Sequence, residues 1–400
     1  MVKLINHACI SIQTKKNFIL FDPWFSGKIF NDSWSLLFEN KIEDINIDQL
    51  THIFVSHEHP DHLHFPTLKS ISEIKKGIKL IFPYRKDLTV KKILEDYGYK
   101  VKYIIQNSEI HEVDQDLKIR YFSNKNEGDH TISIEYYDKV LLNQNDHYTD
   151  TNSIKLINTI YKKIDVLFTQ FSLAGYYGNQ DDPASIKKNG HDWHLNRLSE
   201  YNKIFNPQLI IPFASFVYFC KKSNRYLNDF VVKPEEVYNL LGDKCKFVLP
   251  GKNVFENQSK EEVVDYFQNL FDLTDKEFSE INIIKFEELI KSISSGLKKI
   301  TLLSLVKKLK LRSIILTYFF NPVIIQLSDS KKCIKISFFN NKVSETFNKK
   351  IDFSIPSEEL DYMMKFPWGA DTANITGTVS FYSKKAKYFF MILLLNYKSI

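Results

Sequence analysis

The most informative stretch of the chain reads Ile53-Phe54-Val55-Ser56-His57-Glu58-His59-Pro60-Asp61-His62-Leu63. Its apolar beginning predicts a buried strand. Four potential metal ligands follow within six positions: His57, His59, Asp61 and His62. Because side chains alternate along an extended backbone, His57 and His59 are expected on the same side of the segment. Imidazole and carboxylate groups together are typical ligands of zinc, iron or manganese, so the stretch predicts a metal site.

The length and composition are those of an ordinary soluble globular protein. Of its residues, 44% are hydrophobic and 26% are charged. The length of 400 residues is enough for one large domain and a smaller one. The net charge of +6 is compatible with a small anionic substrate but falls short of a nucleic-acid-binding surface. We therefore expect a small anionic substrate and no nucleic-acid partner.

The cysteines and the chain ends favour a cytoplasmic protein. Cys9, Cys220, Cys245 and Cys333 show no paired spacing, and no leader sequence begins at Met1. No apolar run is long enough to span a bilayer. The closest, at 388–395, is expected to be a buried strand or a terminal helix.

The first fifty residues read as β-structure, with strands at 3–12 and 17–21. Asp22 follows the second strand and is expected to orient a ligand histidine, with a turn-forming role as the alternative. His7 lies in the first strand, where a core position and a position near the metals are equally compatible with the sequence.

A second informative stretch, from Asp129 to His147, reads as a hairpin that turns at its centre. Pairing about this turn sets His130 opposite Asn145 and next to Asp146. Two buried metal ions need a bridging anion to offset their repulsion, and Asp146 is the natural candidate, with a loop role as the alternative. His130 is the expected third histidine ligand, with Asp129 and His147 as competitors.

Further along the chain, other polar side chains follow predicted strands. Lys221, Lys222 and Arg225 come shortly after one strand end, where we expect them to hold a substrate phosphate or carboxylate. Solvated surface cations are the alternative. His191 and His194 form a helical pair that could reach a metal, although a solvated polar face is the favoured interpretation.

The His-x-His-x-Asp-His stretch, with a later His and a bridging Asp, resembles the metallo-β-lactamase superfamily. A finer similarity is to the catalytic region of CMP-N-acetylneuraminate hydroxylase and its bacterial sugar-hydroxylase relatives. It covers about residues 1–255 and, more loosely, 350–380. Beside the metal stretch it rests on Asp22-Pro23-Trp24, Trp34-Ser35-Leu36-Leu37, Pro66-Thr67-Leu68, Asn143 to Asp146, Gln170-Phe171-Ser172, Pro212-Phe213-Ala214 and Phe366-Pro367-Trp368-Gly369-Ala370-Asp371-Thr372.

The resemblance implies an α/β (α+β) fold, a four-layer αββα sandwich with two divalent metal ions at one edge. It implies that His57 and His59 bind one metal, that Asp61 and His62 bind the other, and that Asp146 lies between them.

The second half of the chain changes character. Helical periodicity at 261–271 and 278–310 is followed by predicted strands at 323–327, 333–339, 350–354 and 375–382. We expect residues 1–256 to form the metal-binding catalytic domain and residues 257–400 to form a smaller α+β accessory domain that covers or shapes the active site.

The chain departs from these families in two ways, and the position of the third histidine differs as well. Superfamily hydrolases carry a last metal-binding His after a late strand, where this chain reads Pro212-Phe213-Ala214-Ser215; the hydroxylases also lack it. The hydroxylases are fused to a Rieske iron–sulfur domain with two Cys and two His ligands, but this chain has no Cys-x-His pair. A strict alignment to them would put Lys125, a poor ligand, at the third-His position, so geometry favours His130.

Together these features predict a metal-dependent enzyme with Asp61 and Asp146 as catalytic residues. The favoured function is a diiron oxygenase, a hydroxylase of a polar anionic, possibly N-acylated or nucleotide-linked sugar, with electrons from a separate donor protein. Iron is favoured, and zinc or manganese is possible. The alternative is a metallohydrolase, in which a metal-activated water attacks an amide, ester or phosphoester and Asp61 helps to hold or deprotonate it.

Overall fold

The computed structural model describes residues 1–84, 87–104, 107–124, 128–299, 322–338, 340–348 and 350–397. Lys125 and the part of the expected helix beyond residue 299 lie outside the described residues.

The N-terminal hundred residues form the first of two six-stranded sheets. β3 and β5 run parallel and so end at the same edge of the sheet, where the backbone N–H of Asp22 donates to the carbonyl of Phe54 at 3.0 Å. The expected metal stretch therefore leaves the sheet beside Asp22. In spatial order the strands are β1 (Val2–Leu4), β2 (Ile10–Gln13), β3 (Phe18–Phe21), β5 (Leu50–Phe54), β6 (Lys79–Pro83) and β7 (Lys100–Ile104).

The second sheet carries the predicted hairpin, which is confirmed: β10 pairs with β11 from Ile132 opposite Asn143 to Tyr136 opposite Lys139. β11, β12 and β13 are parallel, so the loops after these strands also share one edge. In spatial order the strands are β13 (Leu209–Phe213), β12 (Val166–Gln170), β11 (Lys139–Asn143), β10 (His130–Tyr136), β9 (Leu117–Ser123) and β8 (Ile110–Asp114).

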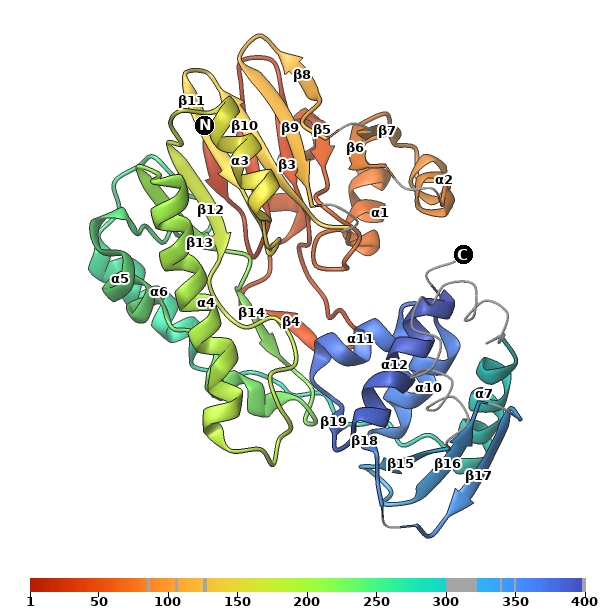
Figure 1. Cartoon of the computed structure of the whole chain (residues 1–400). Coiled ribbons are helices and arrows are strands. Elements are labelled where there is room, and N and C mark those ends of the chain that lie inside the picture. Colours follow the sequence, from red (N-terminus) through yellow and green to blue (C-terminus); the bar gives the residue numbers. More distant parts are fainter. Residues whose placement is uncertain are drawn as a thin grey trace.

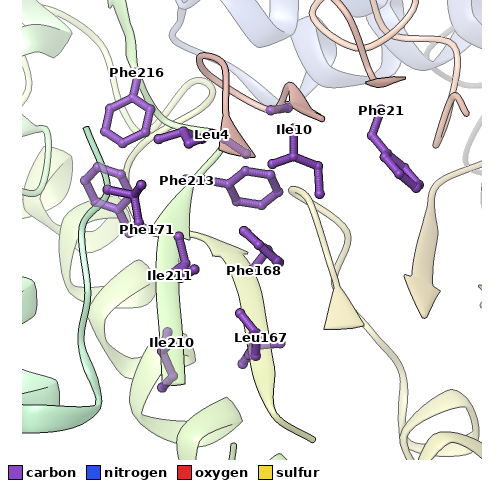
Figure 2. Close-up of a cluster of buried hydrophobic side chains, with 14 of the residues drawn as sticks. Leu4, Ile10, Phe21, Leu167, Phe168, Phe171, Ile210, Ile211, Phe213 and Phe216 are labelled. Carbon is purple, nitrogen blue, oxygen red and sulfur yellow. The ribbon is translucent and has the colours of Figure 1, made fainter. Parts of the chain in front are cut away.

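The two sheets pack face to face with helices outside them, as Figure 1 shows. Leu68 and Ile71 of α1 pack on the outer face of the first sheet, and Leu198 of α4 joins the core of the second. Figure 2 shows part of the core between the sheets, where Leu4 and Ile10 lie next to Phe213. The expected four-layer αββα sandwich is confirmed. Its helices are α1 (Phe65–Ile74), α2 (Thr89–Asp96), α3 (Thr151–Ile160) and α4 (Ala184–Phe205).

Local sequence explains these elements. β12 is apolar over most of its length and buried throughout, as a strand covered on both faces requires. α3 begins at a capping residue, because the Asp150 carboxylate accepts a hydrogen bond from the backbone N–H of Ser153 at 2.7 Å. α1 has Pro66 in its first turn, where a missing N–H has no cost. A two-stranded sheet of β4 (Trp34–Leu36) and β14 (Val217–Phe219) lies outside the sandwich.

A second apolar core is formed by C-terminal residues, from Leu289 to Leu393. Phe267 of α6 still packs into the first core, so we propose that the two units divide near residue 280 rather than at 256. α5 (Pro234–Leu241) and α6 (Lys260–Phe271) both contribute to the first core. The described part of the second unit contains four helices and one sheet. The helices are α7 (Phe286–Lys299), α10 (Ser357–Lys365), α11 (Gly369–Thr376) and α12 (Lys384–Tyr397). The sheet has the order β17 (Lys342–Thr346), β16 (Cys333–Ser337), β15 (Val323–Leu327), β18 (Phe353–Ile355) and β19 (Ser380–Phe381).

The strand expected at 375–382 is mostly wrong. α11 continues to Thr376, Gly377 ends the helix with a left-handed φ of 67°, and only Ser380 and Phe381 pair as a strand. The apolar run near the end of the chain lies in α12, one of the two expected alternatives. Within the described ranges, no helix combines the length and the apolar character that crossing a membrane requires.

Candidate metal centre

The loop between β5 and α1 brings its ligands to the edge where the two sheets meet. His57, Asp61 and His62 are buried, and His59 is partly exposed. Within the described part of the chain, three groups of side chains could hold a metal ion, and all three use residues of this loop.

The first group consists of His57, His59 and Asp129. Nε2 of His57 lies 2.9 Å from Nδ1 of His59 and 3.9 Å from Oδ1 of Asp129. The two histidines therefore present nitrogen atoms to one point, as their alternation along the chain predicted. The carboxylate comes from the residue before β10.

The second group consists of His7, Asp61 and His62. Oδ2 of Asp61 lies 3.2 Å from Nε2 of His62 and 3.4 Å from Nε2 of His7. His7 is held at this edge because its backbone carbonyl accepts a hydrogen bond from the N–H of Ala214 at 2.7 Å. The single strand expected at 3–12 is wrong, because the chain turns between β1 and β2. His7 lies in this turn and faces the candidate metal site, one of the two positions that the sequence allowed.

Asp146 lies between the two groups. Its Oδ2 is 3.8 Å from Nε2 of His57, and its Oδ1 is 3.6 Å from Nε2 of His62. Asn145 has a left-handed φ of 52°, which turns the chain directly after β11 and aims the next side chain into the centre. This geometry suits the bridging role expected of Asp146.

The donor set fits divalent cations. Among the described residues, Oδ1 of Asp61 and Oδ1 of Asp146 are buried and accept no hydrogen bond, although buried polar atoms almost always have a partner. Each group also offers three ligand atoms within reach of one point. Nitrogen and oxygen donors in these numbers suit zinc, iron or manganese.

Two further side chains hold the ligands in place. Asp22 accepts hydrogen bonds from the backbone N–H and the hydroxyl of Ser56, and its Oδ2 lies 3.0 Å from Nδ1 of His62. The hydroxyl of Ser56 is also 3.0 Å from Nδ1 of His57. Asp22 thus contacts a metal-facing histidine as the sequence suggested. Ser56 was missed, although its position directly before the first histidine was a usable signal.

The electrostatics of the centre favour positive charge between the carboxylates. Burial lowers the pKa of His57 to about 4, with a further contribution from the neighbouring His62. Burial also opposes charge on His59, but the facing carboxylates, Asp371 foremost, outweigh it and raise its pKa to about 9. Burial raises the pKa of Asp61, but the adjacent His62 outweighs this effect and holds it well below the usual range. Bound cations would meet the same negative potential.

The other candidate histidines lie elsewhere. None of the three groups formed by described residues includes His130, whose ring lies 5.9 Å from that of Tyr121; Asp129 contributes instead. Nδ1 of His147 is 2.9 Å from the hydroxyl of Thr131.

The helical histidine pair also takes other contacts. Nε2 of His191 is 2.8 Å from Glu236, while His194 is buried with its ring against Trp193. His191 is buried as well, so the favoured solvated face is wrong for the pair.

The three cations that were expected to hold the substrate have other partners. Lys221 is buried, and its ammonium lies 2.8 Å from Glu358 and 2.5 Å from Glu359. Lys222 pairs with Glu280, and the guanidinium of Arg225 stacks 5.7 Å from the ring of Phe278. The sequence could not predict the ion pairs of Lys221, because the carboxylates that bind it belong to the C-terminal unit.

The C-terminal unit also reaches the metal centre. Oδ2 of Asp371, on α11, lies 3.9 Å from Nε2 of His59. Figure 1 shows α11 as the part of this unit nearest to β4. The Nδ2 amide of Asn224 donates to the carbonyl of Thr376 at 3.0 Å, and the hydroxyl of Tyr226 donates to that of Gly377 at 3.2 Å, which fixes the end of α11.

The αββα sandwich thus carries at its edge a cluster of His and Asp side chains that could hold metal ions. No model of a protein family matches the chain. Its sequence is weakly similar to CMP-N-acetylneuraminic acid hydroxylases. It is 26% identical over 257 residues to that of Danio rerio, covering 60% of this chain and 42% of the relative. The chain is 25% identical over 263 residues to the hydroxylase of Cricetulus griseus, and the match covers 62% of this chain and 46% of the relative. These matches span less than half of the relatives' length.

Solved structures with a similar arrangement include hydroxylases and hydrolases. The diiron β-hydroxylase CmlA from Streptomyces venezuelae has a TM-score of 0.41 at 13% identity, covering 70% of this chain and 52% of that one. A possible metal-dependent hydrolase from Veillonella parvula has a TM-score of 0.44 at 14% identity, and the match covers 63% of this chain and 97% of the hydrolase.

Proposed function

We propose that this chain is a diiron oxygenase that hydroxylates a polar anionic substrate and receives electrons from a separate protein. The observation that carries the proposal is the composition of the first ligand group, with two histidines and one carboxylate, His57, His59 and Asp129. Two histidines and one carboxylate with open positions are typical of non-haem iron oxygenases. When bound, iron would supply the activation of dioxygen.

The sequence similarity supports the same class. The matched relatives are named as hydroxylases of a nucleotide-linked sugar acid, which supports a nucleotide-linked or N-acylated sugar as the substrate class. Ala214 follows β13 where lactamase-type hydrolases carry their last histidine. We propose that His7, whose backbone carbonyl accepts a hydrogen bond from Ala214, completes the second metal group with Asp61 and His62.

The residues of the chain would then have distinct roles. Asp146 would bridge the two metals through its two oxygens. Asp22 and Ser56 would fix the rings of His57 and His62, because a histidine that binds a metal through one nitrogen is oriented by the partner of the other.

A metallohydrolase is the second candidate, and one observation favours it. The four cysteines are unpaired, and none of the metal-binding groups among the described residues contains a cysteine. The described chain thus offers no iron–sulfur site of its own, whereas hydrolysis needs no electrons. In that reaction a metal would lower the pKa of a bound water, and the unpartnered Oδ1 of Asp61 would hold it or take its proton.

Metal analysis of protein expressed in iron-supplemented medium tests the proposal, together with optical spectra recorded before and after dithionite and then air. We expect about two irons per chain and a spectrum that responds to reduction and to oxygen. Tightly held zinc without any redox response, even after iron supplementation, would overturn the oxygenase in favour of hydrolysis.

A further inference from the structure

Unpartnered polar atoms gather where α4 covers the ends of β11 and β12. The contacts that join these elements include the backbone N–H of Thr149, which donates to the hydroxyl of Tyr201 at 3.2 Å. Buried polar atoms are almost always hydrogen-bonded, so this junction can take a polar ligand. Among the described residues, the buried atoms here without a hydrogen-bond partner include Nδ2 of Asn143, Oε1 of Gln144, both side-chain polar atoms of Asn145, Oγ1 of Thr169, Nδ1 of His194 and Nε of Arg197.

Arg197 supplies the charge at this junction. It is only 3% exposed, and its Nη2 donates to the side-chain oxygen of Gln170 at 3.0 Å. Within the described part of the chain, the guanidinium forms no ion pair with a carboxylate. Arginine does not lose its proton in proteins, and a buried cation without a counter-ion is strongly unfavourable. The Arg197 guanidinium is therefore suited to an incoming anion.

The guanidinium is coupled to the proposed metal centre through Gln170. The backbone N–H of Gln170 donates to the carbonyl of Asn145 at 2.9 Å, and Asn145 directly precedes the bridging Asp146. Asp146 also lies within electrostatic range of Arg197. One residue at the end of β12 thus connects the loop that carries the bridging carboxylate to the buried cation.

Two partly exposed aromatic side chains border the guanidinium on its outer side. The ring of Trp193 lies 4.7 Å from Cζ of Arg197, and its centroid is 6.3 Å from that of Tyr148. Trp193 and Tyr148 are 41% and 51% exposed. They offer an apolar surface next to a site for charge, an arrangement that fits a ring-bearing anion.

We propose that Arg197 binds an oxyanion of the substrate, a phosphate or a carboxylate, while Trp193 and Tyr148 contact the adjacent part of the substrate. The inference rests on the proposed function for the identity of the reaction but not for the binding itself. A planar guanidinium presents parallel N–H donors that match a phosphate or carboxylate. This site takes the role that the sequence suggested for the lysines and arginine after β14.

The test measures binding at Trp193 in the full chain labelled with 5-fluorotryptophan, both as purified and after removal of metal by a chelator. The chain has four tryptophans, so the ¹⁹F resonance of Trp193 is assigned with Trp193→Phe and the other three report on folding. Cytidine monophosphate and N-acetylneuraminic acid are the probes, with cytidine as the uncharged control. We expect a saturable shift of the Trp193 resonance with at least one of the two anions and none with cytidine.

Variants separate Arg197 from other anion sites. Arg197→Gln should lower the affinity for the anion about tenfold or more, and Arg197→Lys should retain part of that affinity. Arg225→Gln should leave the affinity unchanged. If Arg197→Gln does not fold, Gln170→Glu gives a second test, because a carboxylate paired with Arg197 should abolish anion binding.

Response to the phosphate alone or to the carboxylate alone identifies which oxyanion Arg197 holds. Equal affinity in wild type and the folded variants, or no response to either anion, overturns the proposal. Failure of the diiron assignment would leave the titration of the metal-free chain unaffected.

Discussion

Asp371 lies 3.9 Å from Nε2 of His59, on the side of the imidazole ring opposite to the nitrogen that faces His57. A carboxylate in this position orients a metal-binding histidine and increases its basicity. The contact is made by the C-terminal unit, so that unit takes part in the candidate metal centre.

Asp371→Asn should weaken metal binding about 10–100-fold at the group that contains His59, because the ring loses the carboxylate that orients it. Competition between the protein and a chromogenic zinc chelator at pH 9 measures this affinity with little interference from protons. Asp361→Asn, on α10 and paired with Lys365, is the matched control and should have no effect. Equal affinities for the two variants would contradict the positioning role.

Metal affinity should rise with pH up to about 9. Facing carboxylates outweigh the effect of burial and raise the pKa of His59 to about 9, so metal must displace a proton at any lower pH. The apparent affinity of the His59 group should therefore increase about tenfold per pH unit from pH 6 to 8 and level off near 9. In Asp371→Asn the apparent metal affinity should stop increasing at a lower pH than in the wild type. A plateau already at pH 7 in the wild type would contradict the coupling.

Asp129→Asn and His130→Gln distinguish the two candidates for the third ligand of the first group. Asp129 lies in the ligand group and His130 does not, so only the first variant should lose metal. Stoichiometry by plasma mass spectrometry, after dialysis against a weak chelator, should give about one ion per chain fewer in Asp129→Asn. Loss of metal in His130→Gln alone would restore the assignment made from the sequence.

Asp146→Ala should impair both metal positions, whereas His59→Ala should impair one. The two oxygens of Asp146 face His57 and His62 separately, so their removal takes a ligand from each group. The same metal analysis measures the result. Full metal content in folded Asp146→Ala would remove the bridging assignment.

Lys221→Met should destabilise the fold by about 3–5 kcal/mol, because it leaves the buried carboxylate of Glu359 without its cation. Lys222→Met should cost at most about 1 kcal/mol, since the Lys222–Glu280 pair is largely exposed. Urea unfolding followed by circular dichroism compares the two variants. Similar stabilities would show that the buried ion pair does not hold the units together.

The sequence predicted what depends on local pattern. The metal loop and the β10–β11 hairpin followed from apolar alternation and from ligand spacing, whereas the sandwich was implied by the resemblance to the metallo-β-lactamase superfamily. The choice between Asp129 and His130 could not be predicted, because adjacent residues leave a strand end in opposite directions and the start of β10 decides which one points inward. The ion pairs of Lys221 could not be predicted either, because a lysine reads as available until its partners, far along the chain, are known. Arg197 gave no local signal beyond its position within a long helix.

The contacts of the C-terminal unit with Lys221 and His59 bear on the order in which the candidate metal centre is assembled. Lys221 is synthesised 138 residues before Glu359, and His59 is synthesised long before Asp371. Until α11 has been synthesised, His59 lacks the carboxylate neighbour that Asp371 supplies. The order of synthesis therefore places the completion of this candidate metal group near the end of translation.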